Sequence, residues 1–291
     1  MSTRIEAFEA EDPIQVDVGI AAGLVEVRLV DEPGVQVEVR HAPEAATPWM
    51  EGVSSLLSWV GGQLGDQSDA VDAPTEAVAR TQVEFGAGRL TVRSSKSMPL
   101  RAIPLGVTVL ARTGSEVVVV GGGASITVVG EAGRVKATSG SGVVDVERAT
   151  GPVQVTNGTG AVRVGPVASG VRARSGSGDV EISAVAGPSS VTTGGGDVHL
   201  GRVEGDVMVR SGTGTITVAD ARSGQVELST GTGGLTVAVA QGTPAEFDLT
   251  SGAGTVSNDL PLSREEPAAK PGLRVRGRTG SGDLTVTFAR P

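Results

Sequence analysis

The chain has 291 residues, of which 44 are glycine, 2% are aromatic and none is cysteine or tyrosine. This composition is typical of short strands joined by tight turns around an aliphatic core. The absence of cysteine excludes disulfides, thiolate metal sites and a cysteine nucleophile, and it fits a reducing cytoplasm. The net charge is −9 and the 24 basic residues are scattered along the sequence, so we expect no nucleic-acid partner.

The N-terminal segment, residues 1–18, is acidic and has no apolar stretch of the kind found in secretory signals. No segment approaches the about 18 consecutive apolar residues that a membrane-spanning helix needs. We therefore expect a soluble, cytoplasmic protein that does not insert into a membrane.

Residues 1–43 contain three runs that alternate between apolar and polar residues, at 14–18, 24–29 and 35–39. A two-residue period predicts strands, and turn signals separate the runs at Gly23 and at 31–34. We interpret this region as N-terminal β rungs or a β cap.

Residues 44–78 interrupt the strand pattern and form a predicted insertion. Apolar residues at helical spacing over 48–64 predict a short amphipathic helix, and the acidic stretch 65–76 predicts a flexible loop. The helix either caps one end of the fold or docks on a partner, because tryptophan favours such sites. Its internal glycines weaken the helix, and its lack of Lys and Arg argues against an anionic bilayer. The candidate interaction residues are Trp49, Val53, Leu56, Trp59 and Val60.

Residues 79–291 carry a repeat that decides the fold class. Strand-like runs at 81–85, 90–93 and 107–110 precede a first rung at 121–138, and a G-x-G corner then recurs eight times. Spacings of 18 residues, lengthening to 19, 21 and 28 near the C-terminus, predict stacked rungs with surface insertions in the last three. The first glycines of the corners are Gly140, Gly158, Gly176, Gly194, Gly212, Gly231, Gly252 and Gly280.

Each rung has two alternating segments, so we predict an all-β, parallel β-solenoid with two or more short strands per rung. Equivalent residues of successive rungs should lie about 4.8 Å apart and form ladders. We expect the corner glycines to supply positive φ and the Ser, Thr or Asn before each of them to bond to the turn backbone. Parallel crossovers favour a right-handed coil.

One predicted outward ladder alternates in charge over its first three members, which favours attraction between neighbouring rungs. Its members are Asp145, Arg163, Glu181, His199 and Thr217. We interpret His199 as a solvated ladder residue. Arg163 separates the carboxylates of Asp145 and Glu181, so a glycosidase pair is disfavoured and we predict no catalytic residues.

The glycine-rich corners lack the residue patterns of known metal and phosphate sites. Asp179, Asp197 and Asp283 follow a corner directly, one position earlier than in calcium-binding nonapeptide repeats. No phosphate-binding G-x-x-x-x-G-K-[ST] motif occurs, and only His41 and His199 could supply imidazole ligands. We therefore predict no metal and no cofactor.

The polar stretch 258–271 contains three prolines and reads as an exposed loop. The predicted organisation is an N-terminal region 1–43, an insertion 44–78 and a solenoid 79–291 with a loop at 258–271. We expect these parts to form one continuous domain.

The corner motifs SGSGDVEI, NGTGAVRV and SGTGTITV, the closing RTGSGDLTVTF and the acidic N-terminal strands resemble those of the bacterial toastrack family. This family of β-strand-repeat proteins is also described as a "putative adhesin" family, or domain of unknown function 4097. The resemblance covers nearly the whole chain. Within the family, the sequence is similar to the cytoplasmic actinobacterial branch. The resemblance implies a non-enzymatic protein linked to envelope stress or membrane sensing, and it carries over no catalytic residue.

The leading functional hypothesis is a non-enzymatic scaffold or protein-interaction module with an unknown protein partner. Its exposed ladders, its ends and the segment with Trp49 and Trp59 would be the binding surfaces. One alternative is a self-associating, filament-forming solenoid of the bactofilin type. A carbohydrate-active β-helix enzyme is the other alternative, and it would need converging carboxylates.

Overall fold

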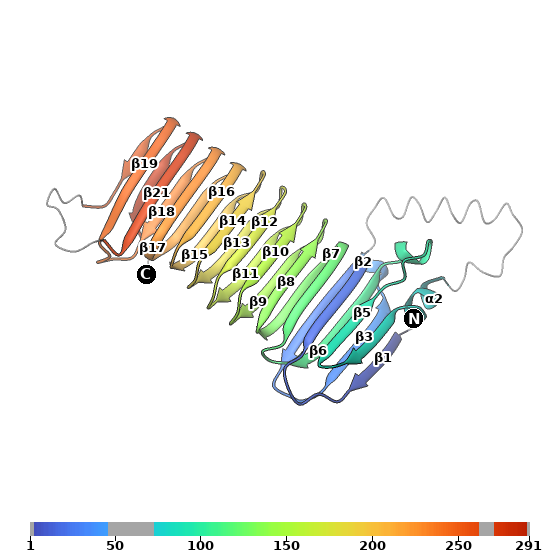
Figure 1. Cartoon of the computed structure of the whole chain (residues 1–291). Coiled ribbons are helices and arrows are strands. Elements are labelled where there is room, and N and C mark those ends of the chain that lie inside the picture. Colours follow the sequence, from blue (N-terminus) through green and yellow to red (C-terminus); the bar gives the residue numbers. More distant parts are fainter. Residues whose placement is uncertain (1–2, 46–72, 262–270, 290–291) are drawn as a thin grey trace, which may run out of the picture. The chain divides into compact units, whose positions relative to one another are not determined.

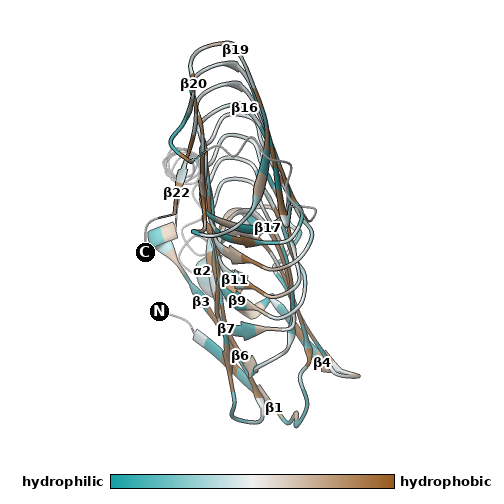
Figure 2. Ribbon diagram, turned by 90° about the vertical axis from the view of Figure 1, so that its left-hand side faces the viewer, coloured by the Kyte–Doolittle hydropathy of each residue, from teal (hydrophilic) through white to brown (hydrophobic). Residues whose placement is uncertain are grey.

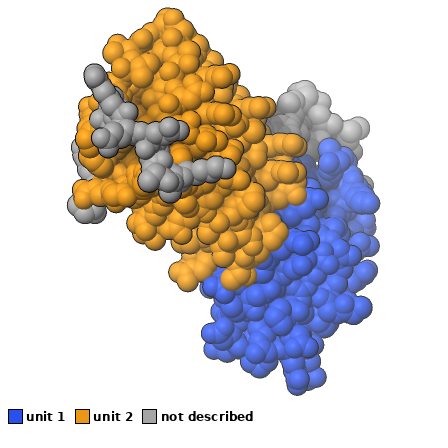
Figure 3. Space-filling view, turned by 60° about the vertical axis from the view of Figure 1, so that its left-hand side comes forward, with its two compact units in different colours: residues 1–143 blue, residues 144–291 orange. Residues whose placement is uncertain are grey.

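The computed structural model describes residues 3–45, 73–261 and 271–289, and most of these residues lie in β-strands (Figure 1). The chain divides into two compact units, Met1–Val143 and Val144–Pro291 (Figure 3). The predicted all-β fold with many parallel strands is confirmed. Among the described residues, no helix is long and apolar enough to cross a membrane.

Unit 2 is a parallel β-solenoid whose rungs contribute strands to two series, and the rungs follow one another in Figure 2. The first series contains β9 (Val144–Ala149), β11 (Val162–Val167), β13 (Val180–Val185), β15 (Val198–Glu204), β18 (Leu235–Val239), β20 (Val256–Asn258) and β22 (Leu284–Phe288). The second series contains β10 (Val153–Asn157), β12 (Val171–Ser175), β14 (Ser189–Thr193), β16 (Val207–Thr213), β19 (Ala245–Ala253) and β21 (Leu273–Ser281). The long β17 (Ile216–Thr232) contributes to both.

The strand register reproduces the sequence repeat. Val153 lies opposite Val171 and Val180 opposite Val198, 18 residues apart in each case, and these side chains are 1% exposed. Inward Val, Ile and Leu residues thus stack into one aliphatic core, as the alternating pattern predicts.

The last two rungs of unit 2 are stacked out of sequence order. β21 lies between β17 and β19, and β22 lies between β18 and β20. Val275 therefore faces Val226 on one side and Phe247 on the other. The sequence pattern predicted sequential stacking, and that expectation is wrong for these rungs.

Charge and side-chain volume favour the exchanged order. Sequential stacking would place Glu227 beside Asp248, and like charges on facing positions repel. In the observed order Arg276 lies between them, 3.7 Å from Glu227 and 4.0 Å from Asp248. Gly277 likewise separates the inward leucines of its two neighbouring rungs, and a Cβ on it would lie 2.9 Å from Leu249 Cδ2.

The corners depend on close backbone stacking. A Cβ on Gly194 would lie 2.4 Å from the carbonyl oxygen of Gly176, so no side chain fits there. The expected positive φ occurs at the second glycine of four corners, Gly214, Gly233, Gly254 and Gly282, and at none of the eight first glycines. The preceding hydroxyl bonds within the turn, since Gly178 N donates to Ser175 Oγ at 3.0 Å.

Unit 1 also stacks its parallel rungs out of sequence order. β2 (Gln15–Val30) pairs on one side with β5 (Arg89–Arg93) and β6 (Leu105–Arg112), and on the other with β7 (Glu116–Ala132). β8 (Arg134–Ser139) pairs with β7. The contact between β2 and β6 requires glycine at position 23, where φ is +130° and a Cβ would lie 1.8 Å from the carbonyl oxygen of Leu105.

Antiparallel strands cover the rung formed by β5 and β6. β4 (Gln82–Gly86) pairs with β5, β3 (Val35–His41) pairs with β6, and β1 (Thr3–Phe8) pairs with β3. Phe8 and Phe85 stack with their ring centroids 5.3 Å apart. Arg4 donates a 2.7 Å hydrogen bond to the carbonyl oxygen of Thr81. Region 1–43 therefore supplies one rung and two covering strands.

The helix α2 (Ala73–Ala79) lies near the N-terminus and buries Ala77 and Val78 against β1, β3 and the 3-10 helix η2 (Leu100–Ala102). A helix in this part of the chain was predicted, but α2 begins in the stretch expected to be an acidic loop. A second 3-10 helix, η1 (Pro43–Ala45), follows β3. The predicted helix over 48–64 lies outside the described residues.

Candidate functional site

The outward side of the second strand series of unit 2 is the candidate site. We call it the arginine face, because four of its outward residues are arginines with no ion pair or hydrogen bond to any described residue: Arg172, Arg174, Arg210 and Arg278. All four are exposed. Alternation along each strand points these side chains to solvent while their neighbours enter the core.

One row across this face alternates between hydroxyl residues and arginines. We call it the hydroxyl–arginine row, and its members in spatial order are Thr156, Arg174, Thr192, Arg210, Ser229, Arg278 and Thr250. The row contains no carboxylate. Its regular alternation depends on the exchanged rung order, because sequential stacking would place Thr250 between Ser229 and Arg278.

The neighbouring row contains the charge pairs. Its spatial order is Gln154, Arg172, Ser190, Met208, Glu227, Arg276 and Asp248. Arg276 pairs with Glu227 and Asp248, and Arg274 on the same strand lies 2.9 Å from Glu246. Carboxylates therefore neutralise these two arginines, whereas the arginines of the hydroxyl–arginine row pair with no carboxylate of a described residue.

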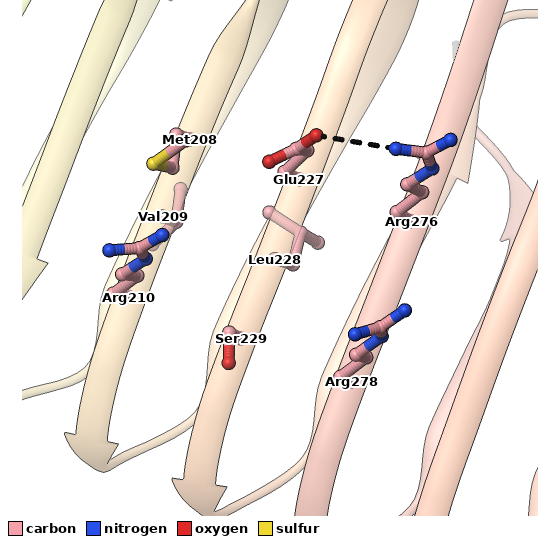
Figure 4. Close-up of a pocket in the computed structure, with 8 residues that line it drawn as sticks. All are labelled: Met208, Val209, Arg210, Glu227, Leu228, Ser229, Arg276 and Arg278. Atoms are coloured by element: carbon pink, nitrogen blue, oxygen red, sulfur yellow. Dashed lines mark ion pairs between the residues drawn. The ribbon is translucent and has the colours of Figure 1, made fainter.

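A groove of about 250 Å³ lies between Arg210 and Arg278. Ser229 lies between the two arginines, and the pair Glu227–Arg276 lies alongside (Figure 4). The short serine leaves space between two guanidinium groups, each of which carries five donors and no acceptor. The groove can therefore accept an anionic group.

The other strand series carries the predicted outward ladder. The register places Asp145, Arg163, Glu181, His199 and Thr217 opposite one another in that order. Arg163 lies 4.0 Å from Glu181, and both side chains are more than half exposed, so this pair contributes little to stability. His199 is exposed.

The aspartates that follow the corners bind the backbone of the next rung. Asp179 Oδ1 accepts from Asp197 N at 2.9 Å, Asp197 Oδ1 accepts from Thr215 N at 2.7 Å, and Asp283 Oδ1 accepts from Thr255 N at 2.8 Å. Sequence reasoning missed this role, although the 18-residue offset between Asp179 and Asp197 was a usable signal. Within the described part of the chain, no three His, Cys, Asp or Glu residues are placed to hold a metal ion.

The predicted site residues divide into two groups. The corner glycines form the structural stack described above. The candidate interaction residues Trp49, Val53, Leu56, Trp59 and Val60 lie outside the described residues. The arginine face was not identified from the sequence, because Arg174, Arg210 and Arg278 are 36 and 68 positions apart and appear scattered.

Comparison with known proteins gives one family and several solved structures. The family model described as Toastrack DUF4097 matches residues 112–289. A "putative adhesin" from Bacteroides fragilis NCTC 9343 is 13% identical, with 98% of this chain and 97% of that chain covered and a TM-score of 0.42. A "Putative lipid binding protein" from Parabacteroides distasonis ATCC 8503 is 10% identical, with coverages of 97% and 96% and a TM-score of 0.36. No curated protein matches the sequence.

Proposed function

The chain belongs to the Toastrack DUF4097 family, and on that premise we propose that it is a non-enzymatic interaction module that binds a protein partner through its arginine face. The observation that carries the proposal is the free arginines of this face. Arg172, Arg174, Arg210 and Arg278 lack described partners in a protein of net charge −9.

The rigidity of the face supports this role. Its strands β12, β14, β16, β17 and β21 are hydrogen-bonded on both sides, so the outward side chains are presented from an ordered backbone. A rigid array loses less conformational entropy on binding than a mobile loop does.

A co-purification experiment from the native host tests the proposal. The wild-type chain is compared with a variant in which the four free arginines are replaced by glutamine. A matched control carries Arg28→Gln, Arg163→Gln, Arg202→Gln and Arg222→Gln, because each of these arginines pairs with a carboxylate and lies outside the arginine face. We expect a protein that is recovered with the wild type and the control but not with the variant. Equal recovery with all three would reject the arginine face as the binding surface.

The segment with Trp49 and Trp59 remains a predicted second binding surface. Deletion of residues 47–65 in the same experiment tests it, and unchanged recovery of partners would count against it. Cytoplasmic localisation and a link to envelope stress also remain proposals, which cell fractionation and expression under envelope stress would test.

A second candidate function is pairing of two copies through the strands β19 and β20. Among the described residues, these strands pair only with β21 and β22. The inward residues Phe247 and Leu249 are only half-buried and Val256 is 47% exposed. An antiparallel pair of β19 strands centred on Leu249 would place Asp248 opposite Thr250, without like charges facing each other.

Such pairing yields a closed dimer rather than a filament of the bactofilin type. A filament of parallel rungs would need a free parallel rung in unit 1, and β3 and β4 cover the rung of β5 and β6 there. Val256→Lys should convert a dimer to a monomer in analytical ultracentrifugation, because an inward charge at an edge opposes pairing. Val120→Lys, at a residue 49% exposed, is the control and should leave the dimer intact. A wild-type monomer at all concentrations would reject this function.

A further inference from the structure

The hydroxyl–arginine row offers hydrogen-bond donors at regular intervals and no negative charge. The guanidinium groups of Arg174, Arg210 and Arg278 have no partner among the described residues. Thr192 and Ser229, which separate them, are exposed and can donate through their hydroxyl groups. A ligand that fits this row must present acceptors, and anionic acceptors opposite the arginines.

The spacing of the arginines restricts the ligand further. Adjacent rungs are about 4.8 Å apart, so arginines on every second rung repeat at about 9.6 Å. The register gives this every-second-rung spacing twice, from Arg174 through Thr192 to Arg210, and from Arg210 through Ser229 to Arg278.

A polyproline II segment matches that repeat. It has three residues per turn and rises about 3.1 Å per residue, so side chains on every third residue repeat at about 9.3 Å. Its backbone carbonyls have no internal hydrogen bonds and can accept from the hydroxyl groups of Thr192 and Ser229. An extended strand repeats its same-face side chains at about 6.6 Å and does not match.

We infer that the hydroxyl–arginine row binds an extended, acidic protein segment in the polyproline II conformation, with a carboxylate on every third residue. This inference rests on the proposed function, since it specifies the partner of the same face. Three carboxylates of one segment pair with Arg174, Arg210 and Arg278, and the middle and last of them flank the groove above Ser229.

Nucleic acid fits the row less well. Each strand of a duplex places one phosphate per about 3.4 Å of helix axis, which is a far denser array of charge than the arginines. Single-stranded nucleic acid needs aromatic side chains for base stacking, and the row contains none.

Two synthetic peptides of identical composition test the inference. Glu-Pro-Pro-Glu-Pro-Pro-Glu carries its carboxylates on every third residue, and Pro-Glu-Pro-Glu-Pro-Glu-Pro carries them on every second. Both peptides are blocked at their termini to remove terminal charges. Each is titrated into the isotope-labelled full chain at low salt, with binding followed by NMR. We expect the first peptide to bind at least about threefold tighter and to shift the signals of Thr192 and Ser229.

The variant Arg210→Gln/Arg278→Gln should weaken binding of the first peptide by about tenfold, because two of the three ion pairs are lost. Its matched control is Arg163→Gln/Arg202→Gln, which removes the same charge from arginines that already have partners. Both variants change exposed residues, so their spectra should otherwise match that of the wild type.

Several outcomes would overturn the inference. Equal affinity for the two peptides would reject the three-residue period, and equal losses in the two double variants would reject the row as the binding site. Tighter binding of a single-stranded DNA heptamer than of the first peptide would favour nucleic acid instead. Loss of the native partner in the four-arginine variant, without peptide binding, would reject this inference and leave the proposed function standing.

Discussion

Each unit has one rung at the end of its parallel stack, and these two terminal rungs differ in how they are covered. The rung of β5 and β6 in unit 1 is covered by antiparallel strands, and its inward residues Leu90 and Leu105 are 0% and 2% exposed. The rung of β19 and β20 in unit 2 has no such cover among the described residues, and its inward Val256 is 47% exposed. A parallel stack can thus end in a closed core or in an open edge.

The open edge carries features that limit aggregation. β20 has only 3 residues, and the outward residues of β19 include Glu246 and Asp248. Short edge strands and charges are common protections of exposed edges. The closed end has no need of them, because β3 and β4 use the hydrogen-bonding groups of the outer rung.

The largest expected effect is at Gly23, where β2 pairs closely with β6. Gly23→Ala should destabilise unit 1 by about 3 kcal/mol or more, because it combines an unfavourable φ with a backbone clash. Gly272→Ala precedes β21 in unit 2, where nothing lies within 4 Å of the new Cβ, and it should be nearly neutral. Urea unfolding of both variants measures the difference in their free energies of unfolding. Equal losses of stability would show that β2 and β6 are not tightly packed at Gly23.

The next largest expected effect is the difference in stability lost when an inward leucine is truncated in the covered rung of unit 1 and in the open rung of unit 2. Leu90→Ala should cost about 2–5 kcal/mol, since it leaves a cavity in a fully buried site. Leu249→Ala in the open rung should cost less than about 2 kcal/mol, because that side chain is only half-buried. Chemical denaturation with a probe in each unit compares them. A larger loss for Leu249→Ala would mean that the open rung is covered in solution.

A smaller effect tests the exchanged rung order. Arg276→Glu places three acidic residues in neighbouring rungs and should destabilise unit 2 by about 1 kcal/mol, since the site is half exposed. Arg276→Gln is the control and should cost about half as much. Thermal unfolding at low and high salt separates the two, because added salt should reduce the difference. A difference that does not depend on salt would contradict the electrostatic explanation.

The smallest effect is a pH dependence in unit 1. The pKa of Glu44 lies below its ordinary value because of a backbone hydrogen bond at Glu44 itself and a hydrogen bond from Arg40. A lowered carboxyl pKa stabilises the fold above the pKa of the unfolded state, and this contribution is lost as the pH falls through the folded-state pKa. NMR titration should show the pKa of Glu44 rising toward its ordinary value in Arg40→Gln. An unchanged pKa would assign the shift to the backbone alone.

Much of the fold could be predicted from particular residues. The 18-residue offset between equivalent valines predicted the register, since Val153 pairs with Val171 as expected. The resemblance to the toastrack family, drawn from the corner motifs, is confirmed by the family match. The rung order near the C-terminus was not predicted, although Glu227 and Asp248 would repel each other in sequential stacking.

The sequence by itself determined the period, the inward faces and the aliphatic core, because these follow from residue types at fixed spacing. Only the tertiary structure decided which rungs are neighbours, because a long connection allows a rung to insert between two earlier ones. That choice places Arg278 two rungs from Arg210 with Ser229 between them. The candidate site therefore depends on the pairing of β17 with β21, which places Arg278 beside Ser229 and which no local pattern specifies.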